Sequence, residues 1–179
     1  MMKSKARTRY LTVEEEGRLL AALPVGVKRD VCAFLFDTGA RVNEALSLTW
    51  DDLRHHERMD RVTFFRTKSG RARTVPLTLR AQECLQRAKL EGRCRPFPVR
   101  YHAFYVAFCK ARDAAGLGKD VVVHTVRHTF ASRLVQRGMG VPKVSLALGH
   151  SSIVLTMRYS HLDPHALDGM TALLQEQAS

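Results

Sequence analysis

Two segments of this sequence place arginine side chains where they could bind an anion. In the first, Thr-Gly-Ala-Arg at 38–41, Arg41 follows a glycine that lets another backbone pass close. In the second, His124 and Arg127 are three residues apart and share one face at the start of a predicted helix. A guanidinium group binds phosphate through two parallel charge-assisted hydrogen bonds. Taken singly, each arginine is more commonly a solvated surface group.

His150 and Tyr159 add two further side chains that could take part in a reaction. His150 directly follows Gly149, which is expected to end a short helix. Tyr159 lies between an arginine and a serine, whereas a tyrosine in a protein core usually has apolar neighbours. Local sequence alone leaves two interpretations of Tyr159 open, a reactive phenol and a half-buried packing residue.

The order of these residues resembles the tyrosine recombinase (phage integrase) family. The matching residues are, in chain order, Arg41, Lys68, His124, Arg127, His150 and Tyr159. The flanking segments TGARVNEALSLTWDDL, RTKSGRARTVPL, HTVRHTFASRL and LGHSSIVLTMRYSHL are also similar to the signature segments of that family. The resemblance extends from about Tyr10 to His161. It implies a catalytic domain with the fold of DNA breaking–rejoining enzymes, acting as a site-specific recombinase or integrase.

The resemblance implies a mechanism in which arginines, not a metal ion, neutralise the phosphate. Arg41 and Arg127 would bind the two non-bridging oxygens of a DNA phosphodiester and stabilise the charge that grows on them. His124 and His150 would add hydrogen bonds, and either could help to remove the phenol proton. Tyr159 would attack phosphorus and form a 3′-phosphotyrosyl link, which is then religated to a partner strand without ATP.

Lys68 and Glu44 would support this reaction. Lys68 is predicted at the tip of a β-hairpin, where the resemblance implies that it is the general acid for the departing 5′-hydroxyl. Glu44 comes one helical turn after Arg41 and is expected to orient Arg41 from a second shell of contacts. No cofactor and no metal ion are expected.

Three other classes of protein remain open on the residues alone. A type IB topoisomerase uses similar chemistry to relax supercoils, although the LGHSS and MRYSH contexts are more similar to integrases. A metal-dependent nuclease is suggested by His124 and His128, which are four residues apart as helical zinc ligands can be, but no third ligand is obvious. The third class is a DNA-binding module that has lost its activity, yet no catalytic position is substituted.

The charge of the chain is consistent with a nucleic-acid partner. The 29 lysines and arginines outnumber the 17 acidic residues, for a net charge of +12, which favours a polyanion over a neutral partner. Together with the resemblance, this predicts double-stranded DNA as the partner. The sequence has no signal peptide and no apolar run of the roughly 18–20 residues that cross a membrane, so we expect a cytoplasmic, nucleoid-associated protein encoded by a bacterium or phage.

The expected fold class is mainly α with a small antiparallel β-sheet. Residues 1–9 are predicted to be a basic linker or arm and residues 10–179 the catalytic domain, without the N-terminal core-binding domain of the family. A helix is expected after Thr12 and before Pro24, since Thr12 and Glu15 form a capping box. The other expected helices cover roughly 28–38, 41–48, 78–91, 100–115, 125–137, 142–148, 152–158 and 164–176, and the expected strands 61–67 and 73–77.

Two helical stripes complete the predictions. The helix 164–176 carries Leu167, Met170, Leu173 and Leu174 at helical spacing. This stripe could pack on its own domain or, as the family resemblance implies, on a neighbouring subunit of a homotetramer on DNA. The stripe Tyr101, Phe104, Tyr105 and Phe108 is interpreted as core rather than as base-stacking aromatics.

Overall fold

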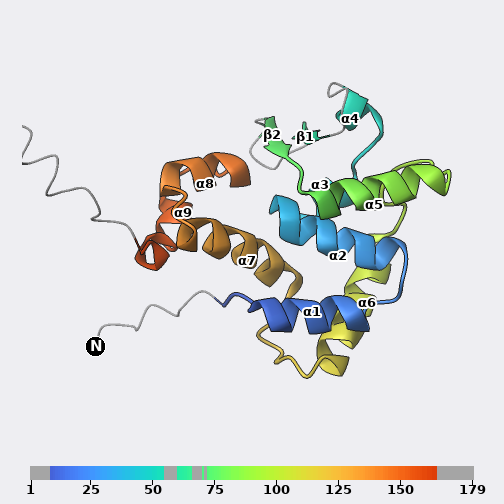
Figure 1. Cartoon of the computed structure of the whole chain (residues 1–179), viewed down its shortest axis with the longest axis horizontal. Helices are drawn as coiled ribbons and strands as arrows, with labels where there is room; N and C mark the ends of the chain where they lie inside the picture. Colours follow the sequence, from blue (N-terminus) through green and yellow to red (C-terminus); the bar gives the residue numbers. More distant parts are fainter. Residues whose placement is uncertain (1–8, 55–59, 66–69, 71, 165–179) are drawn as a thin grey trace, which may run out of the picture.

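The computed structural model describes residues 9–54, 60–65, 70 and 72–164 (Figure 1). The predicted general acid Lys68 and nearly all of the predicted helix 164–176 lie outside this part of the chain. The described elements are, in chain order, α1 (Val13–Ala22), α2 (Val27–Thr38), α3 (Val42–Leu46), α4 (Asp51–Arg54), β1 (Arg61–Phe64), β2 (Arg73–Pro76), α5 (Leu79–Leu90), α6 (Tyr101–Ala114), α7 (Val123–Gln136), α8 (Val141–Leu148), α9 (Val154–Met157) and the 3₁₀ helix η1 (Ser160–Leu162). The predicted fold class, mainly helical with one small antiparallel sheet, is confirmed.

Local sequence signals explain where several helices begin and end. The Thr12 hydroxyl accepts the backbone N–H of Glu15 at 3.2 Å, and the Glu15 carboxylate accepts the N–H of Thr12 at 2.9 Å, so the predicted capping box starts α1. Gly39 and Gly149 end α2 and α8 in the left-handed conformation, with φ of 61° and 63°. These two glycines stand directly before the segments that carry Arg41 and His150.

The two strands form an antiparallel hairpin, and the alternation of side chains along β2 determines which of them are buried. Val62 pairs with Val75 and Phe64 with Arg73 in the register. Successive side chains of a strand point to opposite faces, and in β2 the buried positions are Arg73 and Val75. An arginine therefore occupies a position on the core side of the sheet.

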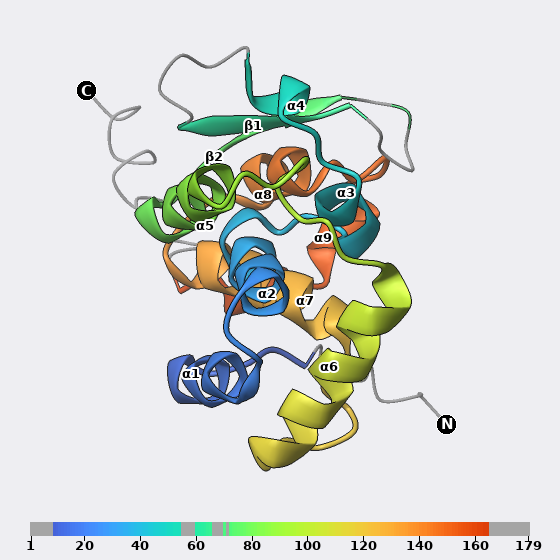
Figure 2. The ribbon, with the colours of Figure 1, turned by 90° about the vertical axis from the view of Figure 1, so that its right-hand side faces the viewer.

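Helix α2 is the centre of the main hydrophobic core. It packs against α5 and α7, and Figure 2 shows it surrounded by α1, α5, α6 and α7. Its inward residues Val31, Phe34 and Leu35 are buried, and the Phe34 ring contacts the rings of Phe64 and Phe97. Burial of each such side chain stabilises the fold by about 1.5–3 kcal/mol. The core thereby fixes the end of α2, which lies three residues before Arg41, the N-cap residue of α3.

A second, smaller hydrophobic cluster joins α7 and α8 to the segment around Tyr159. Its buried members are Ala131, Val135, Val144, Leu148 and Tyr159. Tyr159 lies at the junction of α9 and η1, and only 2% of its surface is exposed. The helix predicted at 152–158 is shorter in the structure, because α9 covers only four residues. The chain then forms the 3₁₀ helix η1 after the tyrosine.

Two further features differ from the sequence predictions. The short helix α4 was not predicted, although Thr49 donates its N–H and its hydroxyl to the Asp52 carboxylate at 2.7 and 2.8 Å and so begins it. In α6, Phe104 is buried but Tyr101 and Tyr105 are 47% and 43% exposed, with their rings stacked at 6.0 Å. The core-facing side of α6 is centred on Phe104, so these tyrosines fall outside it and their prediction as core is wrong.

None of the helices in the described ranges is both long and apolar enough to cross a membrane.

Candidate active site

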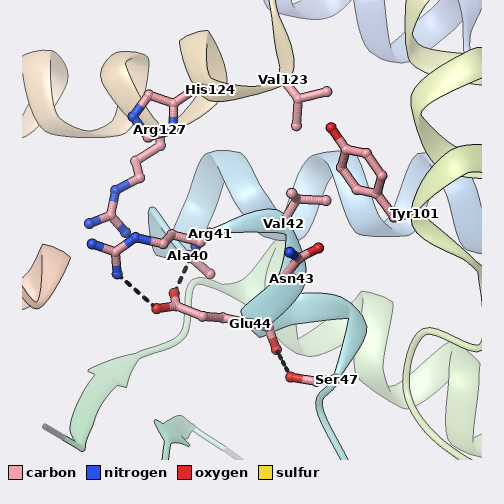
Figure 3. A pocket seen from close by; sticks show the side chains of 10 residues that line it. All are labelled: Ala40, Arg41, Val42, Asn43, Glu44, Ser47, Tyr101, Val123, His124 and Arg127. Carbon is pink, nitrogen blue, oxygen red and sulfur yellow. Dashed lines mark hydrogen bonds and ion pairs between the residues drawn. The ribbon is translucent and has the colours of Figure 1, made fainter. Parts of the chain in front are cut away.

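A cavity of about 610 Å³ opens between the end of α2, the start of α3, and the N-terminal ends of α6 and α7. Figure 3 shows the guanidinium groups of Arg41 and Arg127 next to each other on one side of it, with Tyr101 on the other. The lining residues are Ala40, Arg41, Val42, Asn43, Glu44, Ser47, Tyr101, Val123, His124 and Arg127. Three of the residues predicted for the site, Arg41, His124 and Arg127, therefore meet at one cavity.

Arg127 is a buried cation that forms no ion pair in the part of the chain that the structure describes. Its side chain donates from Nη1 to the Gly39 carbonyl and from Nη2 to the Leu148 carbonyl, each at 2.6 Å. Across the described ranges no carboxylate forms an ion pair with Arg127, whose residue exposure is 3%. Burial, with Arg41 and Arg73 nearby, lowers the pKa of the guanidinium, so a bound anion would relieve this unfavourable environment.

Arg41 is held in place by Glu44, and Glu44 in turn by Arg73. Glu44 accepts the backbone N–H of Arg41 at 2.8 Å and its Nη1 at 2.9 Å. Arg73 donates Nη1 and Nη2 to the two oxygens of the same carboxylate at 3.1 and 2.7 Å. Burial alone would raise the pKa of Glu44, but the hydrogen bonds and charge of Arg73, supported by Arg41, outweigh it and lower the pKa. Glu44 is thus a charged group that orients both arginines.

Arg73 also connects the hairpin to the end of α8. Its Nε donates to the Ala147 carbonyl at 2.9 Å, and its guanidinium lies 4.6 Å from the centre of the Phe64 ring. A methyl group on Gly149 would come within 2.8 Å of the Arg73 Cδ. The arginine therefore packs against the turn that presents His150, which explains why that turn has a glycine.

His150 and His124 approach the arginines from two different elements. The Nδ1 of His150 is 2.7 Å from the Thr156 hydroxyl, and the backbone N–H of His150 donates to the Ser145 carbonyl. Burial, followed by the charges of Arg127 and Arg41, lowers the pKa of His150 to about 4. The pKa of His124 is lowered by the same causes in the same order. Both imidazoles are neutral at pH 7 and can accept a proton.

The phenol of Tyr159 is hydrogen bonded to a histidine that was not among the predicted site residues. The Tyr159 Oη lies 2.5 Å from Nδ1 of His128, and the two rings are 5.9 Å apart. Burial raises the pKa of Tyr159, against the opposing charges of Arg158 and Arg127. The phenol is therefore protonated at neutral pH, and it lies within electrostatic range of Arg127.

Two residues of the site were thus missed by sequence reasoning. Arg73 could have been found from the alternation of β2, which places it on the same face as Val75 and Leu77. His128 was weighed only as a zinc ligand together with His124, whose ring meets the His128 ring edge-on at 4.7 Å. Within the described ranges no group of three or more histidine, cysteine or acidic side chains is arranged to hold a metal ion.

The geometry suits an anion that is both bound and attacked. Two guanidinium groups supply charge-assisted donors at one cavity, and neutral imidazoles surround them. A single phenol, the only buried tyrosine side chain among the described residues, is placed next to helix α7, from which Arg127 and His128 project. Such a set of arginine, histidine and tyrosine side chains has the residue types that a phosphoryl transfer needs.

Comparison with known proteins agrees with this class. The model of the phage integrase family matches residues 9–165. The integrase of Escherichia phage P2 is 33% identical over 175 residues, which cover 97% of this chain and 49% of the relative. The tyrosine recombinase XerD of Corynebacterium glutamicum is 31% identical over 161 residues, 82% of this chain and 52% of the relative. The chain thus spans about half the length of these relatives.

Solved structures share the fold. The catalytic domain of bacteriophage HP1 integrase is 32% identical and has a TM-score of 0.71. The match covers 91% of this chain and 93% of the HP1 domain. The XerH recombinase bound to its difH substrate has a TM-score of 0.72, with coverage of 97% and 56%, but at 21% identity this likeness shows the fold alone. This chain belongs to the phage integrase family.

Proposed function

We propose that this chain is the catalytic domain of a tyrosine-type site-specific recombinase that cleaves and rejoins double-stranded DNA. The observation that carries the proposal is the buried guanidinium of Arg127 beside Arg41, which forms no ion pair with any carboxylate among the described residues. The next residue, His128, is hydrogen bonded to the Tyr159 phenol. A bound phosphodiester would bring negative charge next to this guanidinium. The net charge of +12 and the integrase and recombinase names of the relatives also support DNA as the substrate.

In the proposed reaction, Tyr159 attacks a phosphorus whose non-bridging oxygens are held by Arg41 and Arg127. The product is a 3′-phosphotyrosyl link and a free 5′-hydroxyl, and Lys68 protonates the leaving oxygen. His124 and His150 donate hydrogen bonds to the phosphate when it is bound. Because one phosphate ester replaces another, a 5′-hydroxyl from a partner strand can reverse the step without ATP or a metal ion.

Formation of a covalent DNA adduct tests this function. We expect the wild-type protein, incubated with nicked duplex DNA, to give an adduct that resists SDS and forms in the presence of a chelator. Tyr159→Phe removes the attacking oxygen and gives none. Tyr105→Phe is the matched control, since it removes the hydroxyl of an exposed tyrosine on α6, and its adduct yield equals that of the wild type.

Each alternative function has its own outcome in this assay. Cleavage that stops in chelator and needs no Tyr159 would identify a metal-dependent nuclease. Relaxation of supercoiled plasmid without any recombinant product would identify a topoisomerase of type IB. A wild-type protein that binds DNA but forms no adduct on nicked substrate would refute an active recombinase domain.

We further propose that the active form is a homotetramer on DNA, joined through the predicted helix 164–176, in the cytoplasm and on the nucleoid. Support for the assembly comes from apolar side chains that remain exposed near the described end of the chain. Leu146, Val154 and Met157 are 75%, 72% and 50% exposed. An apolar helix from a neighbouring subunit would remove this surface from water. Chemical crosslinking on DNA, with and without residues 164–179, tests it.

A further inference from the structure

The nucleophile and its neighbour His128 come from elements that are distant in sequence but in direct contact. His128 projects from α7, one residue after Arg127, and Tyr159 lies between α9 and η1. The Nδ1–Oη distance of 2.5 Å is that of a hydrogen bond. A protonated phenol is the donor in this pair, so Nδ1 of His128 is the acceptor.

The charged and titratable groups around His128 keep it neutral. They are His124 on the same helix, Arg158 before the tyrosine, Arg127, and His150 after α8. Burial first, and then these groups, lower the pKa of His128 to about 4. At pH 7 its Nδ1 therefore carries a lone pair that is free to take a proton.

Among the described contacts, the other two imidazoles of the site have partners other than the phenol. Nδ1 of His150 is hydrogen bonded to the hydroxyl of Thr156, and the ring of His124 makes a T-shaped contact with the ring of His128. In the part of the chain that the structure describes, the phenol has one imidazole within hydrogen-bond distance, that of His128. A base must be within this distance of the proton that it removes.

We propose that His128 is the general base of strand cleavage and accepts the phenol proton of Tyr159. This proposal rests on the recombinase function proposed above. As the bond from Oη to phosphorus forms, the proton passes to Nδ1 and leaves an imidazolium. The bond from phosphorus to the 5′-oxygen breaks, and that oxygen receives its proton from Lys68. In religation the proton returns from His128 to the departing phenolate.

The substrate itself makes this transfer feasible. An empty site surrounds His128 with positive groups, which disfavour an imidazolium. A phosphodiester bound between Arg41 and Arg127 brings negative charge into the same cavity, and negative charge raises the pKa of a nearby histidine. His128 is therefore a weak base without DNA and a stronger one when the scissile phosphate is in place.

The decisive experiment separates removal of the phenol proton from protonation of the leaving group. A nicked duplex in which sulfur replaces the bridging 5′-oxygen is cleaved with a thiolate as the leaving group, which needs no general acid. We would measure adduct formation in single turnover at saturating protein from pH 6 to pH 9. The variants are His128→Ala and His128→Asn, because asparagine offers a hydrogen-bond acceptor near the position of Nδ1 but takes up no proton.

We expect both variants to cleave the sulfur substrate about 100-fold or more slowly than the wild type at pH 7, which is the lower end of the range for a general base. The wild-type rate is nearly independent of pH, whereas the His128→Asn rate rises about tenfold per pH unit as more of the phenol ionises. His102→Asn, at an exposed histidine on α6, is the control and cleaves at the wild-type rate.

The outcomes distinguish failure of this inference from failure of the proposed function. If the wild type forms adducts and His128→Asn matches its rate and pH profile, His128 is not the base and the recombinase function stands. If the wild type forms no adduct, the proposed function fails and the inference fails with it.

A second measurement does not depend on activity or on the stability of the His128 variants. The histidine ring protons are titrated by NMR in wild-type protein and in Tyr159→Phe. Loss of a donor that stabilises the neutral imidazole raises the pKa of His128. Identical titration curves for His128 in the two proteins would show that the hydrogen bond is absent and would overturn the proposal.

Discussion

Replacement of Arg73 by methionine removes the cation that holds Glu44 beneath the cavity. In the wild type, Arg73 makes two hydrogen bonds to the Glu44 carboxylate and one to the Ala147 carbonyl, and both charged side chains are more than nine-tenths buried. Methionine keeps a side chain of comparable length without charge. The variant therefore leaves Glu44 buried, with Arg41 as its remaining cationic partner in the described part of the chain.

The expected loss of stability follows from this geometry. Removal of one member of a buried ion pair costs about 3–5 kcal/mol. Because Arg41 still donates to Glu44, we expect the lower end of the range, about 3 kcal/mol. For a protein of this size each kcal/mol lowers Tm by about 2–4 °C, so Tm should fall by about 6–12 °C. Arg61→Met, at an exposed position of β1, should change stability by no more than about 0.5 kcal/mol.

The loss of stability in Arg73→Met should also depend on pH, in a direction that the pKa of Glu44 determines. The pKa of Glu44 is lower in the folded protein than in the unfolded chain, where it is about 4.3. Its stabilising contribution is therefore complete above that pH and is lost as the pH falls through the folded pKa. The difference between wild type and Arg73→Met, measured by urea unfolding, should be largest at pH 7 and should narrow in acid. Equal stability of the two proteins at pH 7, or a difference in stability that does not change with pH, would refute the assigned role of this ion pair.

Three other predictions follow from the described contacts. Arg127→Ala should slow adduct formation in single turnover by about 100-fold or more, because it removes donors to the phosphate; a normal rate would contradict the mechanism. Gly39→Ala should destabilise the fold by about 2–4 kcal/mol in thermal unfolding, since φ is 61° and a methyl group would overlap the Phe130 ring, whereas Gly17→Ala, with open space around it, should not destabilise it. Val154→Asp should reduce crosslinking between subunits on DNA while leaving DNA binding by the single chain intact, and undiminished crosslinking would exclude α9 from the subunit interface.

Much of the fold was predictable because its signals are local. The capping box at Thr12 and the end of a helix at Gly149 depend on neighbours within a few residues, and the structure has both as predicted. The hairpin followed from alternation and a turn sequence. Family resemblance predicted which side chains belong to the site, and the structure brings Arg41 and Arg127 to one cavity. Lys68 stays a prediction, since it lies outside the described residues.

The contacts that were missed join residues about thirty positions apart. Arg73 lies 29 residues after Glu44, and Tyr159 lies 31 residues after His128. Neither pairing follows from helical or strand spacing, because each depends on how separate elements pack. From the sequence alone, both residues could equally be solvent exposed: Arg73 is a charged residue in an alternating strand, and His128 is a second histidine one turn along a helix. Only the packing of β2 against α8, and of α7 against the η1 segment, selects between these interpretations.

The small cluster that contains Tyr159 also has a consequence for local stability. Its buried members all lie between residues 131 and 159 and are separate from the main core around α2. Units of this kind can open without global unfolding, at a lower free energy than the rest of the molecule. Native-state hydrogen exchange should therefore find the amides of α8 and η1 opening before those of α2. The position of the Tyr159 phenol would then depend on a local opening equilibrium that substitutions in the main core leave nearly unchanged.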